Sequence, residues 1–503
     1  MKKTRLIAFA LVLVMLLSML CACSDEQDGN QDGGDRTGDG WDGVDFGGRE
    51  VVVALSTNKY DECNFPAASI YTRGPDSQSS SNPVAQAVVA RNAKAERDIN
   101  VKIKYMEKNL TYDKLLQDIQ DIVLTASTNS PDIYNNDMFG LSRAMMDGLL
   151  WNVKNPGENV KSYFDFSKKG WNETFMKGCT FDQNKYYMFA GDYFIDMLRM
   201  AWVLFVNNDL LKANLGRVGF ESTDEFYEYV EAGIWDYTML ADMCDDVFRD
   251  TKDQGKTSPD DALVGLAYNH VTAWVFGAST GITTYYQDEN RNPKVIDSIS
   301  TLYQVAQKYT NLTSTQGVYY EEQVLTSTNY FLKGNFLFAA SRLGELESDA
   351  VRKSTIDKGI VPVPKWNEQE QEDYHTMVHD QTEIGAILVT AKSFSAASAL
   401  MQALNEDSQQ VIYKYYDEGL KYKYNLGDGQ SYARKMMDIV KNSIDSPFGF
   451  QISAVIGLQY TGTEPLNGLS ISSPEDMSGN FASEKGSYDN NLRLTLEKFS
   501  KLN

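Results

Sequence analysis

The sequence predicts an α/β protein built on doubly wound sheets. Two observations lead to this prediction. From residue 51 onward, strand and helix patterns alternate in the order β, α, β, α, β, α. In addition, the run FLFAA at 336–340 is apolar throughout, which is typical of a strand that is covered on both faces.

The stretch 329–365 contains the clearest unit of this alternation. We expect a buried strand, a polar break, an amphipathic helix and a second buried strand at Asn335–Ala340, Ser341–Arg342, Leu343–Ser354 and Gly359–Val363. Ser341 and Arg342 would lie just past the carboxyl end of the first strand, where open α/β sheets place their ligand crevice. An ordinary unit without a ligand is the alternative.

The first 23 residues predict a lipoprotein signal peptide. Lys2, Lys3 and Arg5 precede an apolar run at 6–20, which is too short to span a bilayer comfortably. Leu-Cys-Ala-Cys at 20–23 resembles the bacterial lipobox, and this resemblance implies that Cys23 is the lipidated residue. Simple secretion and an uncleaved anchor are the alternatives.

Residues 24–48 are almost all Asp, Gly and small polar residues. Such a segment cannot bury enough apolar surface to offset the entropy lost on ordering, so we expect a flexible acidic tether. A lipid, a tether and a globular body together predict a protein anchored on the outer face of the cytoplasmic membrane.

Composition excludes several kinds of site. The formal net charge of −22 argues against nucleic acid, which needs a basic surface. Cys63, Cys179 and Cys244 form neither a disulfide framework nor a zinc motif, and buried free thiols are the expectation. The Asp-rich stretch 250–261 has Lys252 at the third position of a calcium loop, so we expect a surface loop there. We therefore expect no metal and no cofactor.

Further strands and helices follow in the expected order. Strands are predicted at 51–55, 101–105 and 132–134, and helices at 83–98, 112–126 and 141–148. Polar residues follow two of these strands. They are Ser56, Thr57 and Asn58 after the first, and Asn135, Asn136 and Asp137 after the third.

Several stretches, in order, resemble one protein family. They are the lipobox, PDIYNNDMFGLSRAMMDGLLWNV (131–153), KYYMFAGDYFIDMLRMAWVLFVNNDLLKANLG (185–216), GIWDYTMLADM (233–243), FLKGNFLFAASRLGEL (331–346), GIVPVPKW (359–366) and YYDEGLKYKYNLGDGQSYARKMMDIV (415–440). Together they resemble the extracellular solute-binding lipoproteins of ABC importers, in the carbohydrate-type group (family 1) related to maltose-binding protein.

The resemblance implies a two-lobed periplasmic-binding-protein-like fold of class II. Each lobe is then an α/β/α sandwich, and crossover strands join the lobes as a hinge. The implied first lobe comprises 49–190 and about 376–407, and the second comprises about 191–375 and 408–503. Met188–Asp192 and Ala201–Val206 resemble the first crossover, and 381–389 resembles the return.

The resemblance also implies where a ligand would bind. Trp274 matches an aromatic residue that contacts the sugar, and Phe448 matches a late aromatic wall, whereas Trp235 has a packing role. Maltose-binding protein has a Trp at the place of Ser341 and Arg342, so the ligand class can differ here, toward an anionic or densely hydroxylated sugar. The candidate ligand-binding residues are Ser56, Asn58, Asn135, Asn136, Asp137, Asp192, Trp274, Ser341, Arg342, Glu345 and Phe448.

Three functions from different classes fit the sequence. The first is a monomeric solute-binding protein that captures a carbohydrate, an oligosaccharide by expectation, and delivers it to membrane permease subunits. The second is an extracellular glycoside hydrolase, which needs two carboxylates placed across a glycosidic bond. The third is a surface adhesion lipoprotein. Because no motif fixes a carboxylate pair and the sequence has only three His, we expect binding without catalysis.

Overall fold

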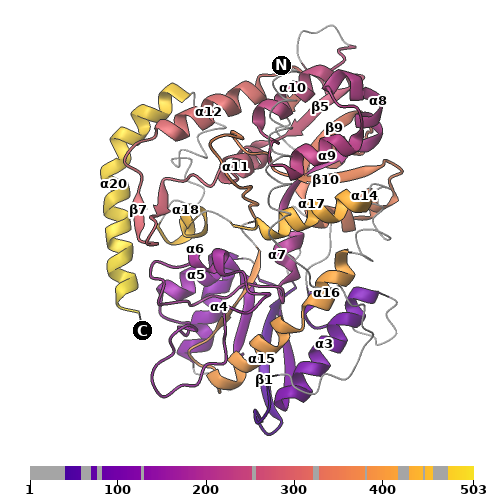
Figure 1. Cartoon of the computed structure of the whole chain (residues 1–503). Coiled ribbons are helices and arrows are strands. Elements are labelled where there is room, and N and C mark those ends of the chain that lie inside the picture. The colour runs from indigo at the N-terminus through magenta and orange to yellow at the C-terminus, as the bar shows by residue number, and fades with distance from the viewer. Residues whose placement is uncertain are drawn as a thin grey trace, which may run out of the picture.

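The computed structural model describes residues 40–57, 69–75, 82–110, 112–125, 130–251, 257–320, 328–379, 382–416, 430–445, 448–456 and 474–502. These residues form two α/β lobes, one above the other in Figure 1. Each lobe has a sheet of parallel strands that includes one antiparallel strand. The predicted fold class is therefore confirmed.

The sheet of the first lobe has the strand order β11-β3-β1-β2. β1 pairs in parallel with β2 and β3, whereas β11 arrives from the other lobe and pairs antiparallel with β3. The elements before β4, of which the last helix lies on the first crossover, are β1 (Arg49–Ser56), α2 (Ser69–Thr72), α3 (Pro83–Ile99), β2 (Val101–Lys108), α4 (Tyr112–Leu124), β3 (Ile133–Asp137), α5 (Met138–Met146), α6 (Glu173–Gly178) and α7 (Ile195–Arg199).

The sheet of the second lobe has the order β10-β4-β9-β5-β8, and β4, which enters from the first lobe, is its antiparallel strand. Its elements are β4 (Trp202–Asn207), α8 (Asn208–Val218), α9 (Thr223–Glu231), α10 (Tyr237–Val247), β5 (Val264–Tyr268), α11 (His270–Ala278), β6 (Tyr285–Gln287), β7 (Pro293–Val295), α12 (Ser300–Thr313), β8 (Val318–Tyr320), α13 (Thr328–Phe331), β9 (Phe336–Arg342), the 3-10 helix η1 (Leu343–Glu347), α14 (Asp349–Lys353) and β10 (Lys358–Pro362).

The chain then returns and touches both lobes. The remaining elements are β11 (Glu383–Ile387), α15 (Phe394–Glu406), α16 (Gln409–Lys414), α17 (Gln430–Asn442), α18 (Phe448–Gln451), α19 (Ser453–Ile456) and α20 (Pro474–Ser500). α15 and α16 pack on α3 of the first lobe, and α17 packs on α9 and β10 of the second. The expected lobe boundaries remain a prediction, although α16 follows residue 408 and yet contacts the first lobe.

The stretch 329–365 differs in detail from its predicted form. β9 continues through Ser341 and Arg342, which pair with Val203 and Trp202 of β4, so these two residues end the strand instead of following it. The expected single helix is divided at Ser348 into η1 and α14. β9 and β10 do not pair with each other, because β4 lies between them.

Two packing predictions are confirmed. Trp235 is fully buried, and its indole N–H donates to the carbonyl oxygen of Pro362 at 2.9 Å. Cys179 and Cys244 are buried free thiols, and burial raises the pKa of both. Cys63 lies outside the described residues.

Candidate functional site

The helix α7 lies where the facing edges of the two sheets meet. The carboxyl ends of β1 and β3 and the start of β11 form one edge, and the carboxyl end of β9 followed by η1 forms the other. α7 contacts both β11 and η1. The backbone N–H of Glu383, the first residue of β11, donates to Asp196 Oδ2 of α7 at 3.3 Å. The seam between the lobes is therefore centred on α7 and lies on the hinge path of the chain.

A buried charge network crosses this seam. Arg199 Nε and Nη2 donate to Glu347 Oε1 and Oε2 at 2.7 and 3.1 Å, and Arg199 Nη1 donates to Asp196 Oδ1 at 3.1 Å. Glu347, from η1, also accepts hydrogen bonds from Tyr71 at 3.1 Å and Tyr415 at 2.8 Å. Since Tyr71 and Tyr415 belong to the first lobe, Glu347 links the second lobe to both the hinge helix and the first lobe.

Glu383 is a carboxyl group of this seam whose pKa is changed by its surroundings. It is buried, and burial together with the nearby Asp196 raises the pKa of Glu383 well above its ordinary value. The backbone N–H of Ser56, which donates to Glu383 Oε1 at 3.4 Å, and the cation of Arg199 oppose that rise. The surroundings of Glu383 therefore favour its neutral form more than water does for an exposed glutamate.

The structure brings the predicted residues of the first lobe to this edge. Ser56 ends β1, and Asp137 caps α5 by accepting from the Gly140 N–H at 2.7 Å. Asn135 donates to the Tyr193 hydroxyl at 3.4 Å, but within the described part of the chain its Oδ1 has no hydrogen-bond partner. The Nδ2 of Asn136 likewise has none, although both residues are buried. Two buried amide groups thus keep unused hydrogen-bonding capacity beside the seam.

The predicted residues of the second lobe are buried at the end of β9. The Arg342 guanidinium lies 5.2 Å from the Trp202 ring centre and 3.6 Å from Glu345 Oε1, so it packs within its own lobe. Arg342 and Glu345 are both 0 % exposed. The hydroxyl of Ser341 is buried and has no hydrogen-bond partner among the residues that the structure describes. In this structure Arg342 is therefore not presented to solvent in an open crevice.

A cavity of about 430 Å³ opens beside α7. Its walls come from the first lobe at 166–174, from the first crossover at 191–198, and from Ile412 of α16 together with the end of α17. Its lining residues are Phe166, Ser167, Lys168, Lys169, Gly170, Trp171, Asn172, Glu173, Thr174, Gly191, Asp192, Phe194, Met197, Leu198, Ile412, Lys441, Asn442 and Ile444. Of the predicted residues, Asp192 lines this cavity.

Close backbone packing positions Asp192. A Cβ added to Gly191 would lie 2.5 Å from the Gly170 carbonyl oxygen, so only glycine lets the crossover pass this close. The Asp192 N–H donates to that same oxygen at 2.6 Å. Asp192 Oδ1 then lies 2.7 Å from Lys441 Nζ. Sequence reasoning found Asp192 but missed Lys441 and Trp171, because neither stands at the end of a predicted strand.

The two aromatic residues that were predicted to contact a ligand, Trp274 and Phe448, lie in different surroundings. Trp274 of α11 is half-buried, and its ring centre lies 4.7 Å from that of Phe450. Phe450 also contacts Phe139 of the first lobe at 5.6 Å, so it lies between the lobes. Phe448 instead packs edge-on against Phe181 at 5.6 Å. Phe450, which the prediction did not include, is the ring of α18 that touches Trp274.

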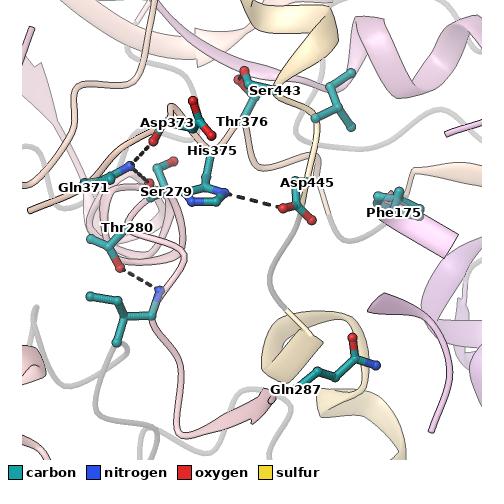
Figure 2. Close-up of polar contacts among 12 residues, drawn as sticks. Phe175, Ser279, Thr280, Gln287, Gln371, Asp373, His375, Thr376, Ser443 and Asp445 are labelled. Carbon is teal, nitrogen blue, oxygen red and sulfur yellow. Dashed lines mark hydrogen bonds and ion pairs between the residues drawn. The ribbon is translucent and has the colours of Figure 1, made fainter. Parts of the chain in front are cut away.

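A second polar region connects α11, the returning chain and the segment after α17. Figure 2 shows His375 and Asp445 pointing toward one another, with His375 Nδ1 3.5 Å from Asp445 Oδ2. Gln371 Nε2 donates to the Ser279 carbonyl oxygen at 3.0 Å, and the hydroxyls of Thr376 and Ser443 are 2.7 Å apart. These contacts fix the second crossover against the ends of α11 and α17.

Some predictions cannot be placed. Asn58, Cys23 and residues 252–256 of the stretch that was compared with a calcium loop lie outside the described residues. Within the part of the chain that the structure describes, no group of three His, Cys, Asp or Glu side chains could hold a metal ion. No helix among the same residues is long and apolar enough to cross a membrane.

Comparison with known proteins identifies the fold. No protein-family model and no curated protein sequence matches the chain. A solved structure of the cyclic α-maltosyl-1,6-maltose binding protein from Arthrobacter globiformis has a TM-score of 0.53 at 13% identity, over 86% of this chain and 97% of that one. The galacto-N-biose/lacto-N-biose I-binding protein of an ABC transporter from Bifidobacterium longum has a TM-score of 0.50 at 13% identity, over 89% and 98%.

A cyclo/maltodextrin-binding protein, solved with maltotetraose, is similar to the same degree, with a TM-score of 0.50 at 13% identity over 90% of this chain and 97% of that one. All three comparisons cover nearly the whole of the solved proteins. The chain therefore has the two-lobed fold of the carbohydrate-type solute-binding proteins, as the ordered sequence stretches predicted.

Proposed function

We propose that this protein is the solute-binding component of an ABC importer, and that it captures a carbohydrate between its two lobes. The solved proteins that share the fold support this proposal, since one is described as part of an ABC transporter and one is complexed with maltotetraose. The proposal is binding without catalysis.

The observation that carries the proposal is the cavity beside α7. Its volume of about 430 Å³ falls within the range of roughly 300–1,000 Å³ that small-molecule sites occupy. The first lobe, the first crossover and the end of α17, which packs on the second lobe, contribute to its wall, so a ligand held there would contact both sides of the first crossover. A ligand that touches both sides of a hinge favours the closed arrangement.

The lining of the cavity suits a sugar. Trp171, Phe166 and Phe194 supply aromatic surface, on which the C–H faces of a pyranose ring pack. Asp192 would accept from sugar hydroxyls and Lys441 would donate to them. Asn172, whose Nδ2 donates to the Ile444 carbonyl oxygen at 3.0 Å, would hold the two sides of the cavity in register.

The remaining candidates form a second part of the proposed site. They are Ser56, Asn135, Asn136, Asp137, Ser341, Arg342 and Glu345 at the seam, and Trp274 and Phe448 near α18. Opening of the lobes about α7 would expose the unsatisfied polar atoms of Asn135, Asn136 and Ser341 to a ligand. Asn58 stays a proposal from the sequence alone.

The proposed location follows from the sequence. A lipid on Cys23 and the acidic tether would hold a monomeric body at the outer face of the membrane, within reach of the permease subunits. Such a protein delivers its ligand by presenting the closed lobes to the permease.

Thermal unfolding of a Cys23→Ala variant tests the function. The variant is heated with a panel of monosaccharides, oligosaccharides, amino acids and peptides, followed by calorimetry on each hit. A true ligand at a hundredfold excess over its Kd should stabilise by about 3 kcal/mol. Stabilisation by amino acids or peptides with none by sugars would contradict the carbohydrate assignment, and turnover of a sugar would contradict binding without catalysis.

A further inference from the structure

The C-terminal helix α20 is long enough to reach from one lobe to the other. It comprises 27 residues, so at 1.5 Å per residue it is about 40 Å long. Figure 1 shows α20, in yellow, running along one side of the molecule from α12 of the upper lobe to the lower lobe. One apolar stripe faces the body along its described length, formed by the buried residues Phe481, Tyr488, Leu492, Thr495 and Phe499.

The first part of α20 is attached to the second lobe. It packs on α12, which in turn packs on α10 and β8. The Tyr285 hydroxyl donates to the Tyr488 carbonyl oxygen at 3.3 Å, and the two rings meet edge to face at 5.9 Å. Lys485 Nζ donates to the Ile296 carbonyl oxygen at 3.2 Å.

The last part of α20 is attached to the first lobe. The Phe499 ring packs against Phe181 at 5.2 Å and Tyr187 at 5.8 Å. Lys498 Nζ lies 3.1 Å from Asp147 Oδ1, at the end of α5. Lys185 donates to the carbonyl oxygen of Leu502. Apolar, ionic and backbone contacts thus all fix this end.

Neighbouring contacts on the same side also join the lobes. Gln287 of β6 donates through Nε2 to the carbonyl oxygens of Lys177 and Thr180, at 2.8 and 3.0 Å, next to α6 of the first lobe. α19 packs on both α5 and α20. The lobes are therefore connected outside the hinge path as well as along it.

We propose that α20 is a strut that sets the separation of the two lobes. A continuous helix resists compression and stretching, so lobe motion must either keep both of its ends seated or detach one of them. Motion about α7 is then confined to the side of the molecule away from α20. This role of α20 is separate from the proposed capture of a solute, and it does not depend on which ligand binds.

Single-molecule energy transfer between dyes at positions 124 and 212 tests the strut without any ligand. These exposed positions lie on α4 of the first lobe and α8 of the second, and azido residues placed there avoid the native thiols. The distance distribution of the unsubstituted protein is the reference. Phe499→Ala and Tyr488→Ala, which loosen opposite ends, should shift and broaden it equally, and the double variant should add nothing.

Leu494→Ala is the matched control, because Leu494 lies on the same helix and its side chain is exposed. The proposal is overturned if the two end variants leave the distribution unchanged or if the Leu494→Ala control changes it as much as they do. Amide hydrogen exchange on the unsubstituted protein is a second test. It needs no variant, so a variant that fails to fold cannot affect it. Amides at 481–499 should be protected along the whole helix, and free exchange at 492–499 would also overturn the strut.

Discussion

Lys441 Nζ lies 2.7 Å from Asp192 Oδ1, and this ion pair joins the end of α17 to the first crossover. Its side chains are 29% and 11% exposed, so water still reaches the pair and a ligand hydroxyl could join it. The same two residues line the cavity between the lobes. One contact therefore serves both the packing of the hinge and the proposed capture of a sugar.

Replacing Asp192 tests that double role. Asp192→Asn keeps the size of the side chain but removes its charge, so we expect a sugar ligand to lose about 1.5–3 kcal/mol, or roughly ten- to hundredfold in Kd. The free energy of unfolding should change by less than about 1 kcal/mol, because the pair is partly exposed. Isothermal calorimetry and urea unfolding measure the two effects.

Glu231→Gln is the control for this substitution. Glu231 pairs with Lys435, also on α17, at 2.8 Å, and neither residue lines the cavity. The control should leave Kd unchanged. Equal losses in both variants would show that α17 acts only through its packing.

Ser341→Ala separates stability from binding. The buried Ser341 hydroxyl has no hydrogen-bond partner in the described ranges, and such a group typically lowers the free energy of unfolding by about 1–3 kcal/mol. Its removal should leave the ligand-free protein as stable or up to about 1 kcal/mol more stable, while ligand affinity falls. Ser443→Ala is the control, because Ser443 bonds the Thr376 hydroxyl at 2.7 Å and its loss should destabilise. A destabilised Ser341→Ala protein with unchanged affinity would argue against a ligand role.

The buried Arg199–Glu347 pair should be strongly coupled. Arg199→Met alone leaves Glu347 buried without its guanidinium partner, and we expect a loss of about 3–5 kcal/mol in the free energy of unfolding. Adding Glu347→Gln should recover a large part of that loss, because the buried charge is removed and the single amide oxygen can still accept from one of the two tyrosine hydroxyls, Tyr71 or Tyr415. The same double-mutant cycle on the exposed pair Arg493–Glu497 should give a coupling below about 1 kcal/mol. Similar coupling in both cycles would contradict the buried network.

Glu383 should make stability depend on pH. Because burial and Asp196 raise the pKa of Glu383 in the folded protein, its contribution to stability is complete below the unfolded pKa of about 4.3 and is lost as the pH rises through the folded value. Glu383→Gln should therefore raise the Tm at neutral pH, by an amount that shrinks as the pH falls toward about 4.3. Calorimetric scans of both proteins across this range measure the gap. A gap that stays constant with pH would show that Glu383 does not titrate in this way.

Helix α20 shows one limit of reading the sequence. The segment after residue 457 contains many Ser, Gly and Asn residues, and no helix was predicted there. Its buried stripe from Phe481 to Phe499 is sparse, and it becomes stabilising only because both lobes present surfaces to it. Local propensity cannot reveal a helix whose packing partners come from α12 and α5.

Local periodicity was enough to predict the alternating α/β pattern, the apolar strand β9 and the polar residues that end β1 and β3. Only the tertiary structure decided that β4 separates β9 from β10 and that Arg342 packs on Trp202 within its own lobe. It also decided that Asp192 meets Lys441, almost 250 residues later in the chain. Contacts between distant segments are set by the burial of complementary surfaces, and no local pattern encodes which surfaces will meet.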